Sequence, residues 1–339
     1  MRQSRSQIEE RGSLAVIHNQ ATVPSSTVRG GQMLKRDRSP RVLCATDLLR
    51  RSNRAVSRAD AIARELDAQL LLLHVVDAGM SARASRRRDA RARFLLAAHA
   101  RKLARSGNGA QISVGTGRRH QTISDVATRW DADLIVLGPH RHRFGDSFLG
   151  TTAERVIRIA DRPLLVVNRD SADPYEQVLL AADLSRMSTG IAHVTKELGL
   201  LNDAQASVVH ARQHMRGAMP YVAGIRESDV GDYQQTLRDV AVDEIGTLLE
   251  SAGLDSARVS VFAEESSPYS AIEDVASRIG ADLVVVGTSR FPVFKRVFIG
   301  SVSNEVLRGI KHDVLVISPV AARRAHRRAW VARRRRDLG

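Results

Sequence analysis

Short apolar runs alternate with segments of helical periodicity along most of this chain. In the first half, the runs that predict strands are 41–46, 69–76, 111–115, 133–137 and 163–168. Between the first two runs, apolar residues recur at helical spacing on one face, at Ala55, Ala59, Ile62, Ala63 and Leu66. The segments that predict helices are 51–66, 83–105, 120–130 and 151–160.

The same order of elements restarts near residue 177. QVLLAAD (177–183) matches RVLCATD (41–47), and ADLVVVG (281–287) matches ADLIVLG (132–138). The remaining runs of the second half that predict strands are 206–211, 259–263 and 313–318, with a helix over 268–279. The Gly- and Pro-containing segment 213–235 has no equivalent in the first half, so we interpret it as an insertion.

Strands that alternate with helices predict βαβ units and a parallel sheet whose right-handed crossovers put helices on both faces. We therefore predict the α/β class, with two tandem five-stranded parallel sheets of strand order 3-2-1-4-5. In such sheets ligands bind beyond the carboxyl ends of the strands, where the strand order reverses. The residue after strand one and the loop after strand four meet there.

A loop of unusual composition follows the fourth strand in both halves. The two copies read LIVLGPHRHRFGDSFLGT (134–151) and LVVVGTSRFPVFKRVFIGS (283–301). Each has a glycine after the strand, an arginine three residues later, and a second glycine beside a hydroxyl residue where a helix begins; these are Gly138, Arg141, Gly150 and Thr151, then Gly287, Arg290, Gly300 and Ser301. Glycine allows close approach of a ligand, and the first N–H groups of a helix attract anions. The pattern predicts a phosphate site in each half.

Composition and charge place the boundaries. We predict a disordered basic extension over 1–39, domains over 40–170 and 176–319, and an Arg-rich tail over 320–339. The net charge of +15 is uneven, because residues 41–170 carry 24 basic against 13 acidic side chains and residues 171–318 carry 13 against 20. Opposite charges of the two domains favour docking within the chain.

Several classes of protein are excluded or disfavoured by the composition. The single cysteine, Cys44, lies in an apolar run, which indicates a buried inert thiol and excludes an internal disulfide. No apolar run reaches the roughly 18 residues that span a bilayer, and no secretory signal opens the chain, so we predict a cytoplasmic protein without a membrane span. Spacings typical of zinc sites, of a Walker A loop or of a nucleophile elbow are absent.

The combined pattern resembles the universal stress protein family in a tandem form. The resemblance rests on Asp47 in CATD, Asp183 in AADLS, His74-Val75, His210-Ala211 and the two glycine loops, and it covers residues 40–170 and 176–319. It implies a Rossmann-like fold of the adenine nucleotide alpha hydrolase-like type. It also implies a protein that binds ATP or a related adenine nucleotide and acts in stress response through nucleotide-dependent contacts rather than as an enzyme. The hydroxyls of Thr151 and Ser301 could add a hydrogen bond or coordinate Mg²⁺.

The resemblance implies a role for each matching residue. Asp47 and Asp183 lie by the adenosine, Val75 and Ala211 offer backbone groups to the adenine, and Ala45 and Ala181 replace a frequent proline. Gly138 and Gly287 lie under the ribose. The phosphates are held by Gly150, Thr151, Thr152, Gly300, Ser301 and Val302. The chain departs from the family's G-2x-G-9x-G-(S/T) loop at Arg141 and Arg290, which replace the second glycine, and the first copy is one residue shorter. A guanidinium there either pairs with phosphate or fills the space of the ligand.

Structural explanations exist for the same residues. An Asp between a strand and a helix is often a turn or cap residue, and Thr151 and Ser301 are good N-caps without any ligand. His74 and His210 lie in apolar strands, which favours a structural role over a catalytic or metal-binding one. The many arginines of 83–105 are typical of a solvated helix face.

Two further functions remain open beside the leading one. The first alternative is a nucleotide-free scaffold that acts through protein contacts. The second is a protein that binds nucleic acid or an anionic surface through the basic run 323–336. Pairing of the last strands, 163–168 with 313–318, predicts a pseudo-dimer within one chain. Whether two chains then form a homodimer is left open by the sequence.

Overall fold

A computed structural model of the chain describes residues 38–79, 81–139, 152–183, 186–211, 239–247, 249–254, 259–264, 266–288 and 300–324. The predicted disordered extension up to residue 37, the insertion 213–235 and the Arg-rich run beyond residue 324 lie outside these ranges. The predicted α/β class is confirmed, since parallel strands alternate with helices in both halves.

The first half is a parallel sheet with helices on both faces. Its elements are β1 (Arg41–Ala45), the 3₁₀ turn η1 (Arg50–Ser52), α1 (Asn53–Glu65), β2 (Gln69–Val76), α2 (Ala82–Arg105), β3 (Ala110–Thr116), α3 (Arg119–Arg129), β4 (Leu134–Leu137), α4 (Thr152–Ile159) and β5 (Leu164–Val166). The strands are arranged in the order β3-β2-β1-β4-β5. All four residues of β4 are buried, because a central parallel strand is covered by helices on both faces.

The second half repeats this plan. Its elements are β6 (Gln177–Ala181), α5 (Arg186–Glu197), β7 (Gln205–Ala211), β8 (Ser260–Glu264), α7 (Pro268–Ile279), β9 (Leu283–Gly287), α8 (Ser301–Gly309) and β10 (Asp313–Ile317), with further helical residues at 239–247, 249–251 and 319–324. The strand order is β10-β9-β6-β7-β8. Local signals set α7: the Ser267 side chain accepts from the Ser270 N–H, Pro268 opens the helix, and Gly280 ends it with φ +63°.

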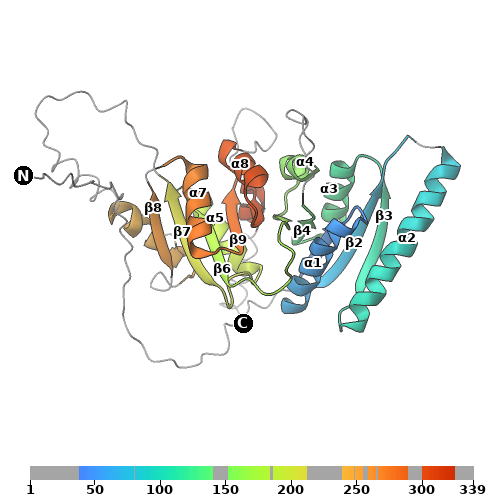
Figure 1. Cartoon of the computed structure of the whole chain (residues 1–339), viewed down its shortest axis with the longest axis horizontal. Helices are drawn as coiled ribbons and strands as arrows, with labels where there is room; N and C mark the ends of the chain where they lie inside the picture. The colour runs from blue at the N-terminus through green and yellow to red at the C-terminus, as the bar shows by residue number, and fades with distance from the viewer. Residues whose placement is uncertain are drawn as a thin grey trace, which may run out of the picture.

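The two sheets form one ten-stranded sheet, because β5 and β10 pair with each other. This pair is antiparallel, with Leu165 opposite Leu315, so the predicted pairing of the last strands within one chain is found. In Figure 1 the two halves therefore lie end to end, with α4 and α8 near the middle and β3 and β8 toward the two ends. Each face of the sheet carries one hydrophobic cluster that runs through both halves.

A buried polar network ties the halves together beside this strand pair. The Asp313 carboxylate accepts hydrogen bonds from the Tyr175 hydroxyl at 2.8 Å and from the Asn168 N–H at 2.8 Å. Arg58 of α1 lies 3.3 Å from the same carboxylate and 4.1 Å above the Tyr175 ring, and its guanidinium also donates to the linker carbonyls of Ser171 and Asp173. Removing the tyrosine proton next to a carboxylate is unfavourable, so burial first, and Asp313 second, raise the pKa of Tyr175 well above its usual value.

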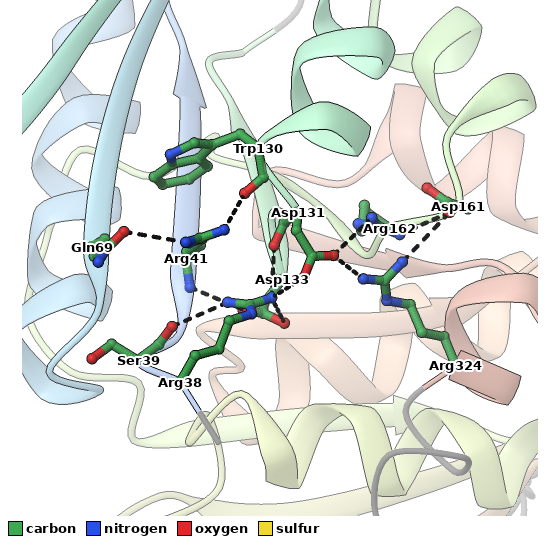
Figure 2. A network of polar contacts seen from close by, with 10 residues as sticks. All are labelled: Arg38, Ser39, Arg41, Gln69, Trp130, Asp131, Asp133, Asp161, Arg162 and Arg324. Carbon is green, nitrogen blue, oxygen red and sulfur yellow. Dashed lines mark hydrogen bonds and ion pairs between the residues drawn. The ribbon is translucent and has the colours of Figure 1, made fainter. Parts of the chain in front are cut away.

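A second network lies at the amino ends of β1, β4 and β5, and Figure 2 shows its ten residues. The backbone of Asp131 adopts the left-handed conformation, with φ +54°. Its carboxylate accepts from Arg38 at 2.8 Å, from Arg162 at 3.3 Å and from Arg324. Arg324 also lies 3.7 Å from Asp161. One carboxylate of the first domain thus binds both Arg38, three residues before β1, and Arg324 at the end of the described chain.

The helical segment 319–324 belongs to this folded body, although we assigned most of it to the tail. Ala321 and Ala322 are buried, and a Cβ placed on Gly190 of α5 would lie 2.7 Å from the Cβ of Ala322. Glycine at position 190 therefore permits the close approach of this segment to α5. Of the basic run 323–336, Arg323 and Arg324 lie within the described residues.

Ion pairs cross between the halves in both directions. Arg58 of the first half meets Asp313 of the second, whereas Arg308 of the second donates to Glu154 of the first at 2.8 Å. In one pair the first half supplies the cation, and in the other the second half does. These pairs contribute to the docking in addition to any attraction between the net charges of the domains.

The single cysteine behaves as predicted. Cys44 is fully buried in β1, and burial raises the pKa of its thiol to about 12. Because the thiolate is the reactive form, this thiol is inert near neutral pH.

Candidate functional site

The carboxyl ends of β1 and β4 bring Asp47 and Gly138 to the same small side chain, Ser52. The Ser52 hydroxyl donates to the Asp47 carboxylate at 2.5 Å. A Cβ on Gly138 would lie 3.2 Å from the Ser52 oxygen and 3.3 Å from its Cα. A side chain at position 138 would press against Ser52, so glycine there eases the close approach of the backbone after β4 to the start of α1.

The chain turns sharply between β1 and α1. The Leu48 N–H donates to the Thr46 hydroxyl oxygen at 3.0 Å, and the Leu49 N–H donates to Asp47 at 3.0 Å. Leu48 has φ +60°, a conformation that is strained for a residue with a side chain. The turn therefore stabilises a conformation in which the Asp47 carboxylate, 41 % exposed, lies at the rim of the sheet.

Opposing effects set the ionisation of Asp47. Partial burial acts to raise its pKa, but the hydrogen bonds from Ser52, Leu49 and Arg51 outweigh burial and hold the pKa below the usual value. The Arg51 guanidinium lies 2.6 Å from this carboxylate. Asp47 is thus an anion near neutral pH and acts as a hydrogen-bond acceptor rather than as a proton donor.

The second half builds the same contact with different packing. The Ser188 hydroxyl donates to the Asp183 carboxylate at 2.9 Å and accepts from the Asp183 N–H at 3.0 Å. Gly287 ends β9, and a Cβ there would lie 2.7 Å from Ile191 and 3.3 Å from Met187. Both aspartates are therefore bound to a serine five residues later, at the start of the following helix.

These serines are functional candidates that the sequence analysis missed. The signal was present, since Asp47 and Ser52 are five residues apart and Asp183 and Ser188 have the same spacing. Neither serine lies in an apolar run or beside a glycine, so the periodicity did not single it out. The contact supports the turn-residue explanation for the aspartates and also fixes the direction of their carboxylates.

The strand register places the predicted adenine-side residues at one level. Ala45 is opposite Leu73 of β2 and Leu137 of β4, so Asp47 and Val75 lie two residues further on and Gly138 one residue further on. In the second half Ala181 is opposite Val209, which lies two residues before the end of β7 at Ala211. The structure brings these positions to one end of each sheet, as the strand order requires.

The histidines have a structural contact. The ring Nδ1 atoms of His74 and His210 lie 2.9 Å from the carbonyl oxygens of Thr46 and Ala182. Each carbonyl belongs to the residue before the aspartate of its domain. Each histidine thus connects β2 or β7 to the turn that presents the carboxylate, which is a positioning role.

The predicted phosphate side lies partly outside the described residues. Arg141, Gly150, Thr151 and Arg290 fall outside them. In the second half Gly300 is the N-cap of α8, with φ −57°, ψ 158° and no side-chain cap hydrogen bond, and Ser301 and Val302 begin the helix. The Ser303 hydroxyl donates to the Gly287 carbonyl at 2.6 Å, which ties this helix end to the end of β9. Thr152 is the first residue of α4 in the first half.

The described residues give no sign of two other kinds of site. They contain no cluster of three or more His, Cys, Asp or Glu side chains placed to hold a metal ion. In the same part of the chain, no helix combines the length and the apolar composition needed to cross a bilayer.

Comparison with known proteins agrees with this geometry. The model of the Universal stress protein family matches residues 39–168 and 174–318. Universal stress protein G of Shigella flexneri is 24 % identical over 143 residues, which are 42 % of this chain and 99 % of the relative. Universal stress protein A homolog 2 of Coxiella burnetii is 28 % identical over 150 residues, 43 % of this chain and 96 % of the relative.

Solved structures share the tandem fold. A protein of unknown function from Pseudomonas aeruginosa PAO1 has a TM-score of 0.60 and 18 % identity, and the match covers 85 % of this chain and 96 % of that one. A universal stress protein from Archaeoglobus fulgidus has a TM-score of 0.59 and 18 % identity, and the match covers 83 % and 98 %. At this identity the likeness concerns the fold.

Proposed function

The chain belongs to the universal stress protein family, and we propose that each of its two domains binds ATP or a related adenine nucleotide at the carboxyl ends of its strands. The observation that carries the proposal is the repeated arrangement of an Asp carboxylate, a helix-start Ser and a strand-end Gly. The two copies share this arrangement although their surrounding side chains differ. The serine contact holds the turn and also fixes the direction of a carboxylate that a ligand can use, and its presence in both domains supports the proposal.

Each part of the proposed site has a chemical role. The carboxylates of Asp47 and Asp183 accept hydrogen bonds from the ribose hydroxyls or the adenine amino group. The N-terminus of α8, which Gly300 leaves without a side-chain cap, offers free N–H groups to the phosphates. Ser301 adds a hydroxyl beside these N–H groups, and Thr152 adds one at the start of α4 in the first domain. Mg²⁺ bound to the phosphates of each site would be held by the nucleotide oxygens and the hydroxyl of that site.

We propose a binding role rather than an enzymatic one. The titratable groups at the strand ends, Asp47 and Asp183, are held by hydrogen bonds from serines, and the pKa of Asp47 is lowered, so it is a weak base. Hydrolysis of a bound nucleotide would then be slow, and the protein would act in stress response by changing its contacts with partners when nucleotide binds.

Equilibrium dialysis of the full chain with labelled ATP tests the proposal. We expect saturable uptake in the micromolar range, because a few charge-assisted hydrogen bonds at a helix end support affinities of about that order. Absence of saturable uptake at millimolar ATP, with other adenine nucleotides failing as well, would refute the proposal. The remaining role would be that of a nucleotide-free scaffold.

A further inference from the structure

The outer face of α2 is a continuous stripe of cationic side chains with one aromatic ring near its middle. We call it the α2 stripe, and its members are Arg87, Arg91, Phe94, Ala98, Arg101 and Arg105. Steps of three and four residues keep these side chains on one face of the helix over about 27 Å. All six are exposed.

The opposite face explains why the stripe points outward. Ala92, Leu96 and Leu103 are buried against the sheet at 3 %, 0 % and 8 % exposure. The helix packs on β2 and β3 from Ala92 onward, and in Figure 1 it lies at the end of the molecule. The position of the stripe is thus fixed by a rigid sheet, and the apolar side of α2 is already used for folding.

The stripe carries a high density of positive charge. α2 contains nine basic residues and a single acidic one, Asp89. Asp89 lies away from the stripe and pairs with Arg93 at 2.8 Å. No carboxylate of α2 therefore neutralises the stripe.

Phe94 gives the stripe a second chemical property. Its side chain is 67 % exposed, the highest exposure among the exposed large apolar side chains of the described residues. Its neighbours along the outer surface include Ala90 and Ala98, whose small side chains leave the faces of the ring accessible. An open aromatic ring between arginines can stack on a base while the arginines bind phosphates on both sides.

We propose that the α2 stripe is a binding surface for single-stranded nucleic acid. The charge attracts a phosphate backbone without regard to sequence, and Phe94 adds a stacking platform for one base. An anionic membrane fits less well, because a membrane-surface helix inserts a broad apolar face and that of α2 is packed on the sheet. This inference is independent of the proposed nucleotide sites, which lie at the ends of the strands.

The test measures fluorescence anisotropy of labelled oligo-U and oligo-dT of about 20 nucleotides, titrated with the full chain over a series of salt concentrations. We expect Arg91→Gln to weaken binding and to lower the salt slope by about 0.7. Arg93→Gln is the matched control, since it removes the same charge from the same helix outside the stripe. It should leave affinity and slope nearly unchanged.

Phe94 supplies the second readout. Phe94→Ala should weaken binding by roughly 5- to 150-fold, the loss expected for one stacked base, while Phe94→Tyr should retain it. The side chains of Arg91 and Phe94 are exposed. We therefore expect the variants to have the thermal midpoint of the parent protein, which would show that they are folded.

Four results would overturn the proposal. The first is an equal loss of affinity in Arg91→Gln and Arg93→Gln, and the second is full affinity of Phe94→Ala. The third is binding that disappears when residues 325–339 alone are removed. The fourth is retention by phosphatidylserine vesicles that depends on Arg91 and Phe94, without binding to the oligonucleotides. The third result would assign the affinity to the basic tail. The fourth would assign the stripe to a membrane.

Discussion

The guanidinium of Arg58 lies 3.3 Å from the carboxylate of Asp313, and the two side chains are 1 % and 0 % exposed although they come from different domains. A charge in such a place is stable only with a partner and with hydrogen bonds for its remaining atoms. Tyr175 and the backbone of the linker supply those bonds. The linker is therefore a structural part of the interface between the domains.

Asp313→Asn should lower the free energy of unfolding by about 3–5 kcal/mol, because it leaves the Arg58 charge buried without its partner. Guanidinium chloride unfolding followed by circular dichroism would measure the loss. Asp170→Asn is the control, since Asp170 also faces an arginine of α1 but is 84 % exposed and 3.8 Å away. We expect less than about 1 kcal/mol for that change. Equal effects of the two variants would show that burial does not govern this interface.

Gly300→Asp should abolish ATP binding at the second site, because it places a carboxylate where the phosphates are proposed to bind. Gly300→Asn is a matched variant of nearly the same size without the charge. Asn and Asp are equally good N-caps, and the φ of −57° at Gly300 accepts either. Isothermal titration calorimetry should show one site lost in the Asp variant and a smaller weakening in the Asn variant. Identical affinities in all three proteins would place the phosphates elsewhere.

Acid should destabilise the domain interface through His312. Burial, and next the Arg169 guanidinium, hold the pKa of His312 below its usual value, against opposing effects of Asp313 and Asp282. With a folded-state pKa below the unfolded value of about 6.5, the unfolded chain binds the proton more readily, so stability falls as pH drops through about 6.5.

The variant His312→Gln tests this. Stability measured by denaturant unfolding between about pH 7 and pH 5, a range that spans the usual histidine pKa, should fall less steeply in the variant than in the parent protein. If the free energy of unfolding changed with pH in the same way in both proteins, protonation of His312 would not contribute to the loss of stability.

Ending the chain after residue 318 should destabilise the protein by roughly 1–2 kcal/mol, whereas ending it after residue 324 should not. The shorter form loses the burial of Ala321 and Ala322 and the contact of Arg324 with Asp131, shown in Figure 2. Thermal unfolding of the two truncated proteins would compare them directly. Equal midpoints would mean that the segment 319–324 contributes nothing to the fold.

Much of the fold follows from periodicity along the chain. LIVL of β4 and the apolar part of DVLVI of β10 are short apolar runs, and burial on both faces makes such runs the strongest signal of parallel strands. Glycines at strand ends marked the loops that carry the proposed sites. Boundaries differ by a residue or two, as in β5, where the predicted 163–168 became Leu164–Val166.

The contacts that fix the site and the interface were not predictable in the same way. Ser52 and Arg58 are polar residues within or beside a helix, and periodicity assigns such residues to solvent. Their partners, Asp47 and Asp313, are known only once the strands are placed side by side. The left-handed backbone of Asp131 likewise has no signal in the sequence, although three arginines converge on it.

Because β5 and β10 pair within one polypeptide, their contact is insensitive to dilution. Two separate subunits joined by the same strands would come apart as their concentration fell, whereas tethered partners keep a high effective concentration. Each of these two strands already has a neighbour on both sides. A second copy of the protein must therefore attach elsewhere, and the pseudo-dimer persists even at very low cellular abundance.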